Sequence, residues 1–209
     1  MLIDLHTHTH PKSDDSLLSP SEIVVKAKKA GLDGICVTEH DWFWAKETAE
    51  HLSKELDFLV LPGIEMNTED GHMIVFGVTE FVFGMHHTDF LRDIVLKKGG
   101  FMILAHPFRH RYYSDEDIAI KVEECYDKPL FKLVDTIETL NGRAKEKQNQ
   151  FSAALGKKLG WQGIAGSDAH FPRDVATVAT KFERDVRNVE ELIRELKAGR
   201  YQPVDLRKK

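Results

Sequence analysis

The stretch KKGGFMILAHP, residues 97–107, joins three features that together predict a β/α fold. Basic residues and a glycine pair end a helix, a short apolar run follows as a buried strand, and a histidine stands where that strand ends. KKAGLDG at 28–34 and KKLGWQGIAGSDAH at 157–170 repeat this order. Three such helix–glycine–strand joints predict repeated parallel β/α units.

Short apolar runs and amphipathic segments alternate along the rest of the chain. Because no linker or low-complexity stretch interrupts them, we expect one domain over residues 1–209. About seven units in ~200 residues favour a barrel-like α/β fold over an open doubly wound sheet. Strands are predicted at 2–5, 34–38, 58–65, 72–78, 101–105, 136–140 and 163–165, and helices at 20–30, 44–55, 88–98, 118–128, 146–159 and 189–198.

The composition narrows the class of protein. Hydrophobic residues make up 42% and charged residues 30% of the chain, which is ordinary for a soluble domain. A net charge of −5 argues against a nucleic-acid polymer as partner, since such domains carry a basic face. The two cysteines, the lack of a long apolar run and the lack of a signal peptide predict a cytoplasmic protein without a membrane partner. Nothing in the sequence indicates an oligomeric state.

Histidines and carboxylates stand at the end of nearly every predicted strand. In parallel β/α barrels the carboxyl ends of the strands meet at one rim, where catalytic groups collect. His6 and His8 are two residues apart in a strand and so face the same side, as do Asp168 and His170. Each pair can act as a chelate.

This set of side chains predicts a metal site. Imidazole together with carboxylate suits zinc, manganese or iron better than calcium or magnesium. About nine candidate ligands exceed what one tetrahedral ion uses, so two or three divalent ions are expected, with a carboxylate such as Glu65 between them. Such a cluster activates water and binds an oxyanion, which is the arrangement used to hydrolyse phosphate esters.

The motifs that carry these residues resemble the PHP (polymerase and histidinol phosphatase) family, in its small stand-alone type. DLHTHTHPKSDDS at 4–16 resembles its first motif, and TEHD at 38–41 its second, usually Thr-Asp-His. PGIEMNTEDGH at 62–72, AHP at 105–107, IETLNGR at 137–143 and GSDAH at 166–170 resemble later segments in the same order. The resemblance spans almost the whole chain and implies a distorted (β/α)7 TIM-like barrel with two or three metals.

The resemblance also implies which residues hold each ion. One ion would take His6, His8, Glu65 and Asp168; a second would take Glu65, His72 and His106; a third would take His40, His170 and an aspartate of the first loop. Counting back five residues from Pro20 favours Asp15 for that aspartate, and Asp14 is the alternative. The loop is one residue longer than is usual in the family.

Several neighbouring residues have two interpretations each. Arg109, Arg143 and Arg173 follow the strand-end motifs and are candidates for binding phosphate through paired hydrogen bonds, or they form ordinary surface ion pairs. His10 is interpreted as a solvated loop residue rather than a ligand. Asp41 either orients His40 or caps the next helix, and the strand carrying Glu138 is expected to support the site rather than to bind metal.

The sequence therefore predicts a metal-dependent phosphoesterase acting on a small phosphorylated metabolite or nucleotide. Glu65 would bridge two ions, and His170 or His40 would protonate the leaving group if the third ion is absent. The alternatives are a metal-dependent hydrolase of a non-phosphate bond and a non-catalytic PHP module. The filled ligand positions argue against the module, and the arginines favour phosphate.

Overall fold

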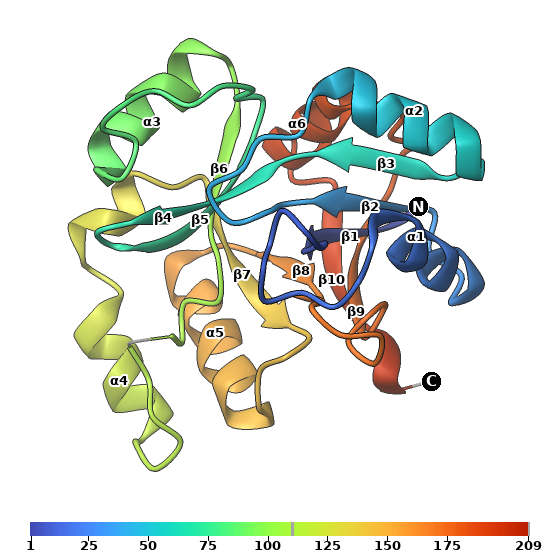
Figure 1. The fold of residues 1–209 in the computed structure, drawn as a ribbon. Coiled ribbons are helices and arrows are strands. Elements are labelled where there is room, and N and C mark those ends of the chain that lie inside the picture. The colour runs from blue at the N-terminus through green and yellow to red at the C-terminus, as the bar shows by residue number, and fades with distance from the viewer. Residues whose placement is uncertain (110, 209) are drawn as a thin grey trace.

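The computed structural model describes residues 1–109 and 111–208. Within them the strands form two five-stranded sheets, with helices packed around the outside (Figure 1). Sheet one has the order β10-β9-β1-β2-β3, and sheet two has the order β4-β5-β6-β7-β8. The strands are β1 (Leu2–Thr7), β2 (Gly34–Val37), β3 (Leu59–Pro62), β4 (Ile64–Thr68), β5 (Gly71–Phe76), β6 (Phe101–Leu104), β7 (Thr136–Asn141), β8 (Ile164–Gly166), β9 (Val178–Phe182) and β10 (Tyr201–Asp205).

The helices lie close to their predicted ranges. They are α1 (Pro20–Lys29), α2 (Lys46–Leu56), α3 (Thr88–Lys97), α4 (Ile118–Cys125), α5 (Glu146–Leu159) and α6 (Val189–Lys197), with short 3₁₀ turns η1 (Pro129–Lys132) and η2 (Leu206–Lys208). Ser19 caps α1 in a capping box with Glu22, and Pro20 occupies the first turn. Among the described residues, no helix has the length and apolarity that crossing a membrane requires.

The predicted α/β class is confirmed, but the regular (β/α)7 TIM-like barrel is not. Two features break the repeat. β4 and β5 form an antiparallel hairpin with no helix between them, and β9 and β10 add two antiparallel strands beside β1. The strands therefore form two mixed sheets, which meet at isolated pairings of Thr7 with Ala169 and of His40 with Glu65.

Gly63 divides what the sequence predicts as one strand. A Cβ there would lie 2.6 Å from Cε1 of Phe76, so only glycine fits the close approach of the two sheets. β3 pairs with β2 up to Pro62, and β4 then pairs with β5 from Ile64 onwards. This change of sheet places Glu65 opposite the end of β2.

Apolar side chains of both sheets share one core cluster. It includes Ile3 of β1, Leu61 of β3 and Phe76 of β5, all almost fully buried, and Leu192 of α6 packs against them. Burying a side chain of this size contributes roughly 1.5–3 kcal/mol. The sheets are thus fixed to each other below the ends of the strands that carry the polar residues.

Candidate metal centre

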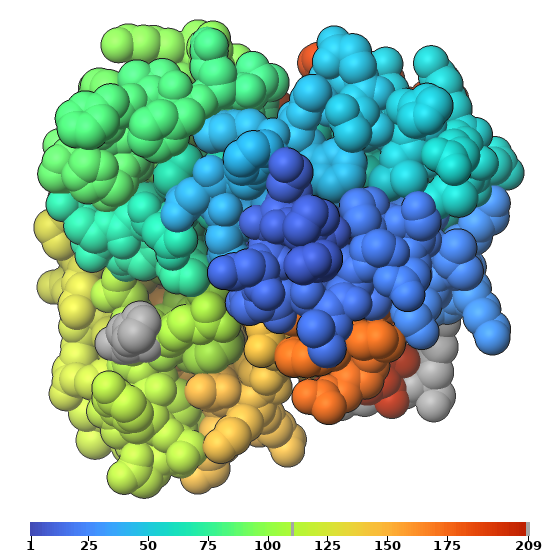
Figure 2. Space-filling model, viewed as in Figure 1, coloured from blue at the N-terminus to red at the C-terminus, as the bar shows by residue number. Residues whose placement is uncertain are grey.

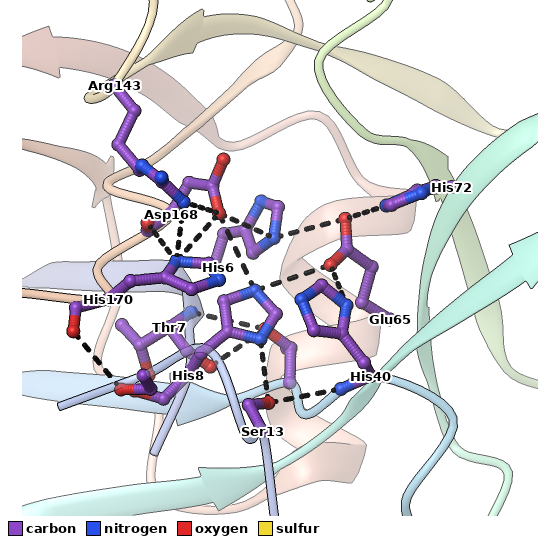
Figure 3. A network of polar contacts seen from close by, with 12 residues as sticks. His6, Thr7, His8, Ser13, His40, Glu65, His72, Arg143, Asp168 and His170 are labelled. Atoms are coloured by element: carbon purple, nitrogen blue, oxygen red, sulfur yellow. Dashed lines mark hydrogen bonds and ion pairs between the residues drawn. The ribbon is translucent and has the colours of Figure 1, made fainter. Parts of the chain in front are cut away.

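The strand ends carry a cluster of histidines and carboxylates in which side chains far apart in sequence point toward one another (Figure 3). All of them stand at positions that the sequence analysis singled out, and most are almost completely buried. The cluster comprises His6 in β1, His8 just after it, His40 after β2, Glu65 in β4, His72 in β5, His106 after β6, and Asp168 and His170 after β8.

His72 reaches the cluster from the beginning of a strand. Because β5 runs antiparallel to β6, its first residues lie at the same edge as the last residues of β6. The N–H of Ala105 donates to the carbonyl of His72 at 2.9 Å, and the rings of His72 and His106 are 5.0 Å apart. The hairpin that breaks the β/α repeat is therefore what brings His72 into the site.

The carboxylate of Glu65 lies at the centre. Its Oε1 is 2.8 Å from Nε2 of His106 and 3.0 Å from Nδ1 of His72. Its Oε2 is 2.9 Å from Nδ1 of His40 and 3.3 Å from Nε2 of His8. Imidazoles from both sheets thus surround one buried carboxylate.

Asp168 follows β8 of sheet two and contacts the histidines at the end of β1 in sheet one. Its Oδ1 lies 3.6 Å from Nε2 of His8 and 3.7 Å from Nε2 of His6. Asp168 and His106 both have positive φ, of +55° and +27°, a region that costs non-glycine residues about 1–3 kcal/mol. The N–H of Asp168 donates to the carbonyl of His6 at 2.8 Å, which helps to hold this conformation.

Asp15 and Asp14 differ in what they contact. Oδ2 of Asp15 lies 3.0 Å from Nε2 of His170 and 3.6 Å from Nε2 of His40. Both aspartates are exposed, and among the described residues no contact of Asp14 with these histidines is recorded. This loop lies across the middle of the face in Figure 2, against the segment that follows β8. The geometry favours Asp15 as the partner of the two histidines.

Glu138 supports the cluster from behind. It is fully buried in β7, with Oε1 3.1 Å from Nδ1 of His6. Its Oε2 accepts from the backbone N–H of His106 at 2.8 Å and from Nδ2 of Asn141 at 3.0 Å. A carboxylate on the far nitrogen of an imidazole fixes which nitrogen faces a metal.

Ser13 contacts the cluster and Glu39 contacts Ser13, and the sequence analysis predicted neither contact. Both side chains are buried, and Oγ of Ser13 lies 3.2 Å from Nδ1 of His8. The sequence feature that could have indicated this role is the position of Glu39, an acidic residue two positions after the buried strand that ends at Val37. An acidic side chain at such a buried position requires several hydrogen-bond donors.

The three arginines have different surroundings. Nη2 of Arg109 donates to Oδ2 of Asp168 at 3.3 Å, and Nη1 of Arg143 lies 2.9 Å from Nδ1 of His170. Both of these side chains are about one-third exposed at the edge of the cluster. Arg173 is 82% exposed and lies beside Asp174 and the ring of Phe171 instead.

Asp41 and His10 lie outside the cluster. The carboxylate of Asp41 accepts from the backbone N–H of Asn67 at 2.8 Å and from its Nδ2 at 2.6 Å, so it ties the loop after β2 to β4. His10 is exposed, in the loop after β1.

Two family models match parts of the chain. A model described as PHP-associated matches residues 146–201, which include α5, β8, Asp168 and His170. A model of a family of unknown function (DUF6282) matches residues 1–87.

Proteins called probable phosphatases are similar to the chain over most of its length. One from Caldicellulosiruptor saccharolyticus is 26% identical and covers 84% of each chain. One from Vibrio campbellii is 27% identical and covers 87% of this chain and 82% of its own.

Solved structures share the fold. A two-domain protein from Bacteroides vulgatus, described as containing a predicted PHP-like metal-dependent phosphoesterase, matches with a TM-score of 0.64 at 18% identity, over 98% of this chain and 64% of its own. The resemblance to the PHP family is confirmed. A protein from Chromobacterium violaceum, described as an amidohydrolase with bound sulfate and no metal, matches with a TM-score of 0.65 at 16% identity, over 98% of both chains.

Charges in this PHP-like cluster are distributed unevenly. Burial lowers the pKa of His8 to about 3 and also lowers that of His106, so both imidazoles are neutral near pH 7. Burial lowers the pKa of His6 as well, but surrounding carboxylates, Glu65 first, raise it well above its ordinary value. The surrounding carboxylates therefore favour the protonated form of His6 when no metal is bound.

The pKa values of the carboxylates in the cluster are lowered, in contrast to that of His6. Burial raises the pKa of Glu65, but the charge on His6 and hydrogen bonds from neighbouring imidazoles hold it well below its usual range. Asp168 behaves similarly, with its pKa lowered to about 2 by His6 and His106 against the effect of burial. A divalent cation would replace the proton on His6 as the positive charge between these carboxylates.

Unpaired polar atoms show that this cluster suits a metal. Burying such atoms without a partner costs free energy, and cations bound between them would offset that cost. Among the described residues there are four sets of three donor atoms, and the atoms within each set lie within 4.8 Å of one another. Because the sets share residues, the donors form one continuous cluster. Among the described residues, the unpaired buried atoms of the cluster are Nε2 of His6, Nε2 of His8, Nδ1 of His40 and Oε2 of Glu65.

Proposed function

We propose that the chain is a metal-dependent phosphoesterase. The observation that carries this proposal is the buried carboxylate of Glu65, which imidazoles from both sheets surround. Three histidines of the cluster, His6, His8 and His40, each have a buried ring nitrogen without a hydrogen-bond partner among the described residues. Arg109 and Arg143 stand at the edge of the same cluster. The names of the similar probable phosphatases support the same chemistry.

The cluster would hold two or three divalent ions of zinc, manganese or iron. Bound there, they would lower the pKa of a water molecule, so that hydroxide could act as the nucleophile. They would also place positive charge beside the phosphoryl oxygens. Glu65 lies where it can contact more than one ion, because its two oxygens face different groups of histidines. His40, His170 and Asp15 form the outermost group and would hold the third ion.

Side chains of the protein bind and protonate the substrate in this proposal. Arg109 and Arg143 both lie beside Asp168, and each is exposed enough to turn toward a phosphate once cations neutralise that carboxylate. His170 or His40 donates a proton to the leaving oxygen when the third ion is absent. Arg173 would contribute only to a substrate that extends beyond Phe171.

The proposed substrate is a small phosphorylated metabolite or nucleotide. The net charge of −5 disfavours a polyanion, whereas two arginines beside a buried cluster match one phosphate group. Hydrolysis of a non-phosphate bond is the second candidate, favoured by the fold shared with the protein described as an amidohydrolase.

The test is phosphate release from phosphorylated metabolites, nucleotides and short oligonucleotides, with amides and lactones measured in parallel. Protein reloaded with zinc, manganese or iron is compared with chelated protein. We expect metal-dependent phosphate release that His6→Ala and Glu65→Ala abolish. His10→Ala is the matched control for His6→Ala, since His10 is exposed in the same segment. Hydrolysis of amides or lactones alone would replace the proposal with the second candidate.

A further inference from the structure

Glu39 is a fully buried carboxylate that contacts none of the candidate ligand side chains in the recorded interactions of the described residues. It accepts from the backbone N–H of Thr9 at 2.8 Å, from Oγ of Ser13 at 2.6 Å and from Nε1 of Trp44 at 3.1 Å. The hydroxyl of Thr9 also donates to it. These donors fix the carboxylate of Glu39 at the foot of the first loop.

Ser13 connects this carboxylate to the cluster, and the direction of its hydrogen bonds is determined. A hydroxyl has one proton, and here it points to Oε2 of Glu39, because both oxygens of that side chain lie among donors and act as acceptors. Oγ of Ser13 must then accept from its other neighbours. These are Nδ1 of His8 at 3.2 Å and the backbone N–H of His40 at 3.3 Å (Figure 3).

The acceptor role of Ser13 determines the tautomer of His8. A neutral imidazole carries one proton, and accepting at Oγ requires that proton to be on Nδ1. The lone pair of His8 is then on Nε2, which is the unpaired atom 3.3 Å from Glu65 and 3.6 Å from Asp168. The same oxygen holds the backbone of His40 in place.

We infer that Glu39, acting through Ser13, is a positioning residue that sets the tautomer of His8 and the place of His40 for metal binding. This inference rests on the proposed function in that the cluster binds divalent ions. It adds a second support to that of Glu138, which contacts His6 directly. Partners of this kind typically change metal affinity by about 10–100-fold.

The first measurement is the tautomer of His8 in metal-free protein labelled with ¹⁵N-histidine. Two-bond ¹H–¹⁵N spectra distinguish Nδ1–H from Nε2–H imidazoles, and His8→Ala assigns the signal. We expect Nδ1–H in the wild type and in Ser13→Thr, which keeps the hydroxyl. In Ser13→Ala and Glu39→Gln we expect a mixture of tautomers. An Nε2–H tautomer of His8 in the wild type would overturn the inference.

The second measurement is the affinity for zinc or manganese, by competition with a chelator. We expect affinity about 10–100-fold weaker in Ser13→Ala and Glu39→Gln, and near wild type in Ser13→Thr. Trp44→Phe is the matched control, since it removes one donor to Glu39 and leaves Ser13 in place. An equal loss in Trp44→Phe would show that Glu39 only stabilises the loop, which overturns the inference.

The two measurements separate this inference from the proposed function. If Ser13→Ala and Glu39→Gln bind metal as tightly as the wild type, the positioning role is wrong while the metal centre stands. If the wild type binds no metal, the proposed function and this inference both fail. If the wild type binds metal but releases no phosphate, the phosphoesterase proposal fails and the positioning role stands. Because Ser13→Ala and Glu39→Gln alter different side chains, misfolding of one leaves the other to decide.

Discussion

Asp15 and Asp14 are adjacent in one loop, but within the described part of the chain it is Asp15 that contacts the cluster, through His40 and His170. We expect Asp15→Asn to weaken binding of the outermost ion by at least about ten-fold. Loss of a residue that only hydrogen-bonds to a metal ligand already weakens binding by about that factor. Asp14→Asn, which removes the same charge from the same loop, should change little. Calorimetric titration with manganese measures both. Equal losses would mean that the net charge of the loop matters rather than a ligand.

The positions of the candidate ligands could be predicted because each stands in a short motif beside an apolar run. His6 and His8 illustrate this, since alternation along a strand requires no tertiary information. Which ligand each supporting residue contacts could not be predicted in this way. The family resemblance placed Glu138 on a supporting strand but did not place it beside His6, and Glu39 was not singled out. Glu138 meets His6 across 132 residues of sequence, and Glu39 acts through a serine 26 residues earlier. Such contacts depend on how the sheets are placed, which local patterns do not encode.

At the scale of single elements, Gly63 is the joint between β3 and β4. A Cβ in Gly63→Ala would lie 2.6 Å from the ring of Phe76, so the variant must shift the strand or the ring. Overpacking of this kind costs about 1–3 kcal/mol, and we expect an unfolding midpoint in urea lowered accordingly. Adding Phe76→Leu should recover part of the loss. Stability equal to wild type in Gly63→Ala would show that the sheets tolerate a wider separation.

The helices and most strands could be predicted because their apolar periods and caps are local. Ser19 and Pro20 mark the beginning of α1 in the sequence as they do in the structure. β10 was not predicted because it contains Pro203, which is typical of a loop or an edge strand. It is indeed an edge strand, beside β9. β9 was not predicted either, and the direction in which β5 pairs is absent from the sequence pattern, which is why a regular barrel was predicted.

At the scale of the whole molecule, the candidate ligands link the two sheets. His6 belongs to β1 at the centre of sheet one, with His8 directly after it, and Glu65 and His72 belong to sheet two. We expect divalent ions at about 100 times their dissociation constant to stabilise the fold by about 2.7 kcal/mol. For a chain of this size, that raises the melting temperature by roughly 5–10 °C.

Differential scanning calorimetry with and without zinc or manganese measures this shift. Glu65→Gln is the control, because it keeps the shape of the side chain but removes the central charge. We expect the metal-dependent rise to disappear in this variant. A rise of the same size in Glu65→Gln would mean that the stabilising ions bind elsewhere on the molecule.

Sheet two is built from one continuous stretch of chain, β4 to β8, whereas sheet one combines β1 to β3 with β9 and β10. During translation at about 5–20 residues per second, β1 therefore leaves the ribosome roughly 10–35 s before β9, its partner on one side. Throughout that interval the edge of β1 is unpaired and open to other nascent chains. Until β9 is made, this edge is a place where two nascent chains could pair with each other instead of completing sheet one.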